Sequence, residues 1–174
     1  MLKAARELIE EVGLDGLTLA AVAERAGVAV GTVYNRFEDR AHLVEEVVGQ
    51  WTEQVSVTFG EFSEQGNGSA DPEASFLALA HLFRENRVFI RQFLIHAPLQ
   101  PGIAARIAPW LEKERSRLVA GLATSTVDRR SRADLAATMV LATLERSALT
   151  RVDDEAYWAR LEVDLPAAGA ALLA

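Results

Sequence analysis

Cysteine is absent from the 174-residue chain, which excludes a disulfide framework, a thiolate zinc site and a cysteine nucleophile. The three histidines, at positions 42, 81 and 96, are too far apart to form a helical metal-binding pair. No apolar run approaches the roughly 20 residues that a membrane span needs, and the first eleven residues carry three glutamates, unlike a signal peptide. We therefore expect a cytoplasmic protein that uses no metal, no cofactor and no membrane.

The chain also has fewer basic than acidic residues. The chain has 18 basic and 25 acidic residues, a formal net charge of −7, and residues 1–45 alone hold five basic and eight acidic residues. Nucleic-acid-binding proteins are usually basic. If this chain binds DNA, a few well-placed side chains must therefore do so, rather than a broad electrostatic field.

Apolar residues are plentiful, at 50% of the chain, and they recur at three- and four-residue steps. Strand-type alternation never persists, so the pattern predicts an all-α fold of about nine helices. Residues 66–72 are the clearest loop, and Pro166 is expected to kink the last helix. The expected helices cover residues 2–13, 18–26, 29–36, 39–64, 72–83, 86–96, 103–124, 131–150 and 154–173.

Residues 18–37 have the pattern of a helix-turn-helix. Thr18 suits the N-cap of a short helix, and Ala23 and Ala26 are small enough for two helices to cross closely. Gly27 supplies the positive φ that a tight turn requires. An ordinary three-helix packing unit with polar surface residues remains the alternative reading of this spacing.

The second helix of this motif presents polar side chains away from its core. At 100° per residue, Val33 and Phe37 define the buried direction, and Gly31 and Asn35 point almost opposite to it. A glycine in the outward position lets the backbone approach a surface closely. Asn35 has the amide geometry for adenine and Arg36 can reach guanine or phosphate, whereas Thr32 and Tyr34 have hydroxyls suited to phosphate oxygens.

A series of short motifs between Ala5 and Leu43 carries a family resemblance. The motifs are Leu8-Ile9-Glu10-Glu11-Val12-Gly13, Thr18-Leu19, Val22-Ala23, Ala26-Gly27-Val28, Gly31-Thr32-Val33-Tyr34, Phe37, Arg40 and Leu43. In this order and without gaps, they resemble the DNA-binding domain of the TetR family of bacterial transcriptional regulators. The match covers about a quarter of the chain, and the family has a run of six further helices in the remainder.

The resemblance implies where DNA would be contacted. It assigns Thr18 to a phosphate at the start of the second helix and Arg40, at a position usually held by lysine, to a phosphate at the N-terminus of the fourth helix. The residues expected in or beside the major groove are Gly31, Thr32, Tyr34, Asn35 and Arg36.

The sequence also departs from the family pattern. Ala29 and Val30 replace residues that are usually serine and a polar or basic residue, so two DNA contacts are expected to be missing. Val30 is expected either to pack on a thymine methyl or to face the small core. The basic arm that most family members carry before the first helix is not seen ahead of Met1.

Residues 1–45 are therefore predicted to form a DNA-binding domain, and residues 46–174 an effector-binding and dimerisation domain. The resemblance implies a homodimer joined by the two last helices, and an unknown effector that is apolar or aromatic by default. The alternative for each candidate effector residue is core packing or plain surface. These candidates are Trp51, Phe93, His96, Trp110 and Arg146.

The predicted function is a ligand-responsive transcriptional regulator, most often a repressor, that binds a palindromic double-stranded DNA operator as a dimer. The alternative is a helical small-molecule-binding protein whose DNA binding is weak or lost. No nucleophile and base, and no metal set, stand at a catalytic spacing. We therefore expect no enzymatic activity.

Overall fold

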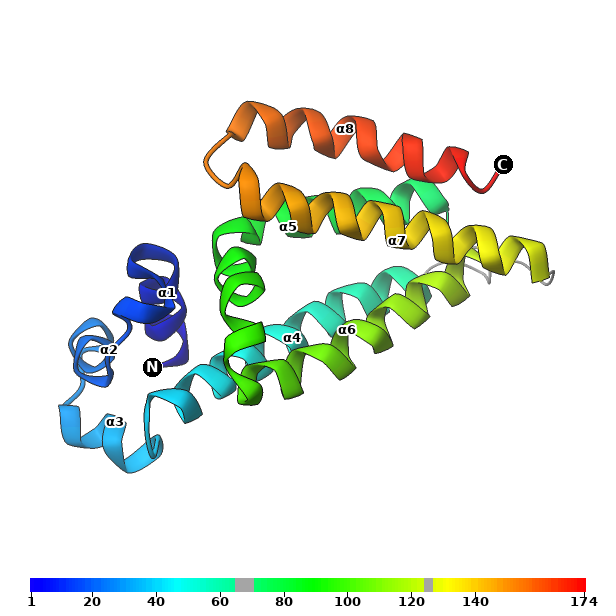
Figure 1. The fold of residues 1–174 in the computed structure, drawn as a ribbon. Coiled ribbons are helices and arrows are strands. Elements are labelled where there is room, and N and C mark those ends of the chain that lie inside the picture. The colour runs from blue at the N-terminus through cyan, green and yellow to red at the C-terminus, as the bar shows by residue number, and fades with distance from the viewer. Residues whose placement is uncertain (65–70, 124–126) are drawn as a thin grey trace. The chain divides into compact units, whose positions relative to one another are not determined.

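The computed structural model describes residues 1–64, 71–123 and 127–174, and within these ranges every regular element is a helix. These three ranges contain eight α-helices and one 3₁₀-helix (Figure 1), which confirms the predicted all-α fold with one α-helix fewer than expected. Residues 66–70 of the predicted loop lie outside the described residues. The helices are α1 Leu2–Gly16, α2 Leu19–Ala26, α3 Val30–Arg36, α4 Arg40–Glu64, α5 Pro72–His96, η1 Ala97–Leu99, α6 Pro101–Leu122, α7 Val127–Thr150 and α8 Glu155–Ala171.

The chain divides into two compact units. The first unit joins Met1–Val55 to Gln92–Trp110, so it contains α1 to α3, the first part of α4, the end of α5 and the start of α6. The second unit joins Ser56–Arg91 to Leu111–Ala174 and contains α7 and α8. A boundary between two functional domains near residue 45 stays a prediction.

The prediction of two helices between residues 72 and 96 is wrong, because α5 continues from Pro72 to His96. The expected interruption lay at Arg84, Glu85 and Asn86. Arginine and glutamate are strong helix formers. The Asn86 side chain donates a hydrogen bond to the carbonyl of Leu82, one turn earlier, at 2.8 Å, so it does not cap a new helix.

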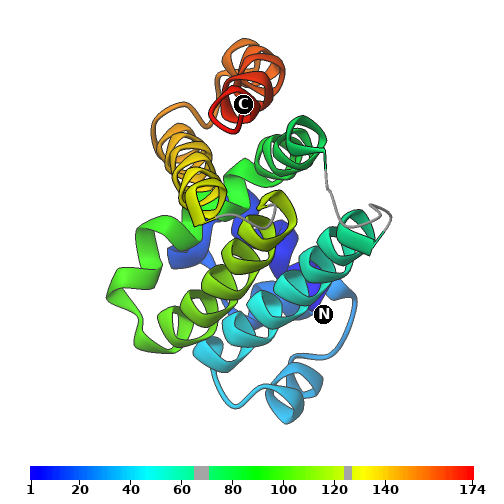
Figure 2. The same ribbon diagram turned by 90° about the vertical axis from the view of Figure 1, so that its right-hand side faces the viewer.

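In the second unit, α8 packs closely against α7 and α5. Figures 1 and 2 both show α7 and α8 side by side. At Gly169 the approach is so tight that a Cβ atom would lie 2.8 Å from side-chain atoms of Phe76 and Val140. The buried Pro166 lies inside α8, which runs on to Ala171. The kink expected at this proline stays a prediction.

Ion pairs also join α8 to α5. Arg84 binds the carboxylates of both Glu155 and Glu162, and Arg87 Nη2 lies 2.9 Å from Glu155 Oε2. The hydrogen bond from Arg84 lowers the pKa of Glu155. Burial alone would raise the pKa of Glu162, but its hydrogen bonds with Arg84 and His81 outweigh burial and lower it. The ion pairs therefore stabilise this packing most at pH values at which both carboxylates are ionised.

None of the helices in the described part of the chain is long and apolar enough to cross a membrane.

Candidate nucleic-acid interface

The predicted helix-turn-helix is present as α2 and α3. Thr18 is the N-cap of α2, and its Oγ1 accepts a hydrogen bond from the amide of Ala21 at 3.1 Å. Gly27 ends α2 in the left-handed conformation, with φ 66° and ψ 33°. The amide of Val28 then donates to the carbonyl of Ala23 at 3.0 Å, which closes the turn before α3 begins.

A small apolar core supports this pair of helices. Val33 is the buried residue of α3. Phe37, which follows α3, is also buried, as the helical angles predicted. Buried residues on α1 and α2 include Leu8, Ile9, Leu14, Leu19, Val22 and Ala23.

The remaining face of α3 is exposed. Tyr34 has 57% of its surface exposed, and Arg36 is also exposed, with its guanidinium 5.5 Å from the centre of the Phe37 ring. Thr18, outside α3, is exposed as well. The structure thus places the predicted groove-facing residues on one accessible helix. The other exposed residues of this set are Gly31, Thr32 and Asn35.

Gly31 is not required by the fold. A Cβ atom at this position would meet no other atom within 4 Å, and the backbone of Gly31 does not have a positive φ. Alanine favours a helix more than glycine does. The missing side chain at position 31 therefore helps neither packing nor backbone geometry, and it leaves the backbone open to an external surface.

Most basic side chains of the first 45 residues are already engaged within the protein. Arg25 forms ion pairs with Glu11 at 2.5 Å and Glu7 at 3.8 Å. Arg6 pairs with Glu10 at 3.2 Å. Lys3 likewise lies 3.9 Å from Glu7. These pairs reduce the positive charge that these side chains offer to DNA phosphates.

Arg40 takes an unexpected position. Its Nη2 donates to the carbonyl of Leu14 in α1, and its Nε is buried without a hydrogen-bond partner in the described structure. The guanidinium therefore ties the start of α4 to α1. Its predicted phosphate contact stays a prediction.

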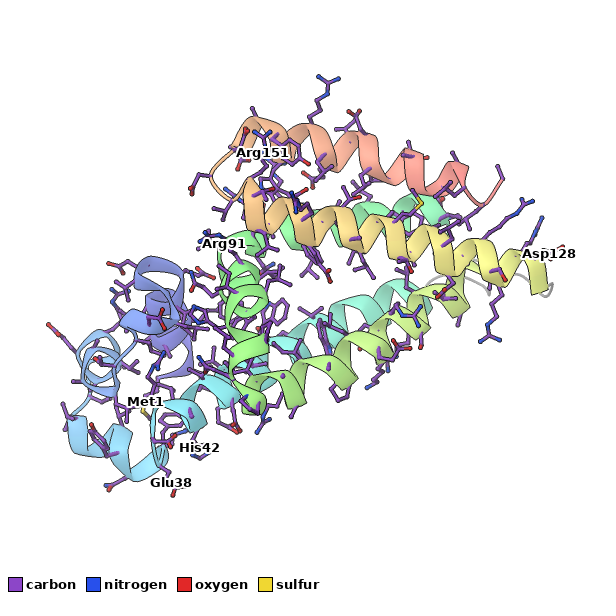
Figure 3. All side chains as sticks on the ribbon, in the orientation of Figure 1. Met1, Glu38, His42, Arg91, Asp128 and Arg151 are labelled. Carbon is purple, nitrogen blue, oxygen red and sulfur yellow. The ribbon has the colours of Figure 1, made fainter. Side chains whose placement is uncertain are left out.

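The turn between α3 and α4 is fixed by reciprocal capping. Asp39 accepts a hydrogen bond from the amide of His42 at 2.8 Å, as an N-cap residue does. The amide of Glu38 points back toward His42 Nδ1 at 3.4 Å. Figure 3 labels Glu38 and His42 at this turn. These bonds set the direction in which α4 leaves α3.

The departures from the family pattern lie at the start of α3. Val30 is 45% exposed, so it does not face the small core. Ala29 is the N-cap of α3 and makes no side-chain capping bond.

Four of the five candidate effector residues belong to the first unit. The rings of Trp51 and Trp110 are 5.4 Å apart and inclined by 55°. Trp51 and Phe93 are buried. His96 is mostly buried, with Nδ1 3.9 Å from Asp15 Oδ1. The structure therefore brings Trp51 and Trp110 together and places His96 beside α1.

Arg146 belongs to the second unit and is exposed on α7. Helical periodicity puts it on the same face as Leu135 and Met139, which are 54% and 50% exposed. Sequence reasoning did not single out the neighbouring Glu145, a half-buried carboxyl whose pKa burial raises. Nothing in the sequence pattern distinguishes it from surface glutamates.

Comparison with known proteins supports the predicted family. Residues 1–47 match the family model described as bacterial regulatory proteins, tetR family. A transcriptional regulator from Rhodococcus sp. RHA1 superposes with a TM-score of 0.81 at 23% identity, over 99% of this chain and 93% of that one. No curated protein matches the chain.

Two other solved structures share the fold. A regulator of the TerR/AcrR family from Aquifex aeolicus VF5 gives a TM-score of 0.75 at 18% identity, over 96% of this chain and 94% of that one. The regulator FadR from Bacillus subtilis, in complex with stearoyl-CoA, gives 0.61 at 19% identity, over 99% and 93%. The predicted resemblance is thereby confirmed: this chain has the N-terminal domain of the TetR family of bacterial transcriptional regulators and, over nearly its whole length, the fold of solved regulators.

Proposed function

We propose that this protein is a cytoplasmic, dimeric transcriptional repressor that binds a palindromic operator and is released from it by a small molecule. The observation that carries the proposal is the exposed face of α3. There Thr32, Tyr34, Asn35 and Arg36 surround a glycine that the fold does not need. Polar side chains around an open stretch of backbone suit close contact with the major groove.

A second copy of the chain is needed for tight binding. One acidic helix-turn-helix offers few phosphate contacts, so specific binding requires two copies on one duplex. The exposed apolar face of α7, with Leu135, Met139 and Leu149, supplies a surface for that copy. Val163 on α8 is a further exposed apolar residue, with 70% of its surface accessible.

The effector is proposed to be apolar or aromatic. Trp51 and Trp110, whose rings are in contact, and the buried Phe93 are aromatic residues of the kind that line sites for such molecules. The solved FadR of Bacillus subtilis holds stearoyl-CoA, which supports a largely apolar effector. Helix α4 carries Trp51 and begins four residues after the end of α3, the proposed recognition helix. A ligand that tilts α4 would therefore move α3.

The test is selection of DNA from a random-sequence duplex pool by the purified chain, followed by binding measurements with Gly31→Ala. We expect one palindromic sequence to be enriched. Gly31→Ala should bind that sequence at least tenfold more weakly, because a methyl group separates the backbone from DNA. Its melting temperature should stay equal or rise, since alanine favours the helix by up to about 1 kcal/mol.

The alternative is a small-molecule-binding protein that has lost DNA binding. It is favoured by the engaged basic side chains of α1 and α2 and by the contact of Arg40 with Leu14. Failure to enrich any sequence would support this alternative and contradict the repressor. Equal binding of an enriched sequence by Gly31→Ala and the wild-type chain would instead show that the backbone at position 31 does not approach DNA closely.

A further inference from the structure

The break in α1 leaves one backbone amide without its usual helical partner. Gly13 has φ 76° and ψ 172°, a conformation that only glycine adopts readily. The amide of Leu14 therefore cannot continue the regular ladder of helical hydrogen bonds. Leu14 is fully buried, and a buried amide needs an acceptor.

The acceptor comes from α5. Gln92 Oε1 lies 3.2 Å from the Leu14 amide nitrogen, although the two residues are 78 positions apart. A Cβ atom at Gly13 would lie only 3.2 Å from the same oxygen. Glycine at position 13 therefore allows the turn and also leaves room for the Gln92 side chain. One helical turn further, His96 Nδ1 is 3.9 Å from Asp15 Oδ1.

The carbonyl of the same residue is held from the other side. Leu14 O accepts a hydrogen bond from Arg40, the first residue of α4, and another from the amide of Leu17 at 3.2 Å. Arg40 follows the end of the recognition helix by four residues. The main-chain groups of Leu14 thus connect the end of α5 with the start of α4.

We propose that Gln92 is a positioning residue for DNA binding. It touches no DNA, but it fixes the Leu14 backbone, and Leu14 in turn holds Arg40 and the end of α3 in the orientation that fits the groove. This inference rests on the proposed DNA-binding function. It adds a specific side chain of α5 that controls the recognition helix.

The test replaces Gln92 with methionine, which has a similar length but no strong acceptor, and with glutamate, which keeps an acceptor oxygen. Amide hydrogen exchange of Leu14 is followed by NMR. Affinity is measured for the duplex that the wild-type chain selects from a random pool. A hydrogen bond of about 1 kcal/mol corresponds to about fivefold. We expect Gln92→Met to raise the exchange rate of the Leu14 amide and to weaken DNA binding by about that factor. Gln92→Glu should keep both the exchange rate and the DNA affinity close to those of the wild-type chain.

Gln50→Met is the matched control, because Gln50 is an exposed glutamine on α4 in the same unit. It should change neither measurement. If Gln92→Met does not fold, Gln92→Ala is measured in its place. Faster Leu14 exchange without weaker DNA binding, or unchanged exchange, would overturn the positioning role. A wild-type chain that selects no duplex would instead overturn the proposed function, and this inference with it.

Discussion

The proposed recognition helix α3 and the paired helices α7 and α8 expose different kinds of residue. On α3 the exposed set is polar around Gly31, and a single residue of the helix, Val33, is buried. On α7 the exposed face carries Leu135 and Met139. Burying these apolar side chains against another surface would lower the free energy of the system. The first surface suits a hydrated, charged partner such as DNA, and the second suits another apolar protein surface.

Two glycines make the same contrast. Gly31 faces open space, whereas Gly169 faces Phe76 and Val140 at distances that leave no room for a Cβ atom. Glycine at position 169 is therefore required by packing within the protein. Glycine at position 31 is required by neither packing nor backbone conformation within the described structure, which agrees with the DNA contact proposed for it. The same residue type thus points to function in one region and to stability in the other.

The largest expected effect follows from charging the apolar face of α7. Met139→Asp should convert the dimer to a monomer at micromolar concentration, because an unpaired carboxylate would be buried between two chains. Operator binding should fall by at least a hundredfold with it. Light scattering and binding isotherms check both effects.

Leu77→Asp is the control for this substitution, because Leu77 is 46% exposed on α5 and Met139 is 50% exposed. It should leave the dimer intact. A dimer that survives Met139→Asp would show that this face is not the interface.

The next effect distinguishes two kinds of residue on α3. Asn35→Ala should cost about 1–3 kcal/mol on the selected sequence and relax preference at one base pair, as loss of a base contact does. Thr32→Ala should weaken all sequences alike and reduce the salt dependence by about one counterion. Titrations on selected and random duplexes at several salt concentrations separate them. Equal losses for Asn35→Ala on both duplexes would show that Asn35 does not read sequence.

Gly169→Ala is expected to lower the free energy of unfolding by an amount similar to the loss of binding free energy for Asn35→Ala, without an effect on DNA binding. The added methyl group would overlap Phe76 and Val140, and overpacking of this kind costs about 1–3 kcal/mol. The melting temperature should fall, while affinity for the selected duplex at a temperature where the chain is folded should not change. Gly31→Ala is the matched substitution and should show the reverse. A stability gain from Gly169→Ala would remove the contrast between the two glycines.

The smallest expected effect concerns Glu145. Burial raises its pKa in the folded state, so its contribution to stability is present below the unfolded pKa and is lost as the pH rises through the folded value. Glu145→Gln should therefore raise the melting temperature at pH 7.5, and the gain should shrink as the pH falls toward the unfolded pKa. Glu85→Gln, at an exposed glutamate on α5, is the control. A gain that does not depend on pH would rule out burial of charge as its cause.

Local sequence patterns predicted the helix-turn-helix well. Thr18 as an N-cap, Gly27 in the turn, and Val33 and Phe37 as the buried side are all found in the structure, because neighbours within one or two turns determine them. The helix-turn-helix and the all-α class follow from such short-range chemistry.

Long-range contacts could not be predicted in this way. Gln92 and Leu14 are 78 positions apart, and no periodicity indicates that a glutamine on α5 accepts a bond from a break in α1. The hydrogen bond from Arg40 to the carbonyl of Leu14 also joins residues far apart in the chain, and no local pattern indicates it. The phosphate contact of Arg40 stays a prediction. The single helix α5 was missed because polar residues in mid-helix resemble a boundary until their tertiary contacts are known.

Footprinting of the selected duplex by the intact chain, with the number of bound chains counted, tests the central claim most directly. We predict two chains bound to two protected half-sites whose centres lie about 34–36 Å apart, one turn of the double helix. One chain on a single protected segment would contradict the account.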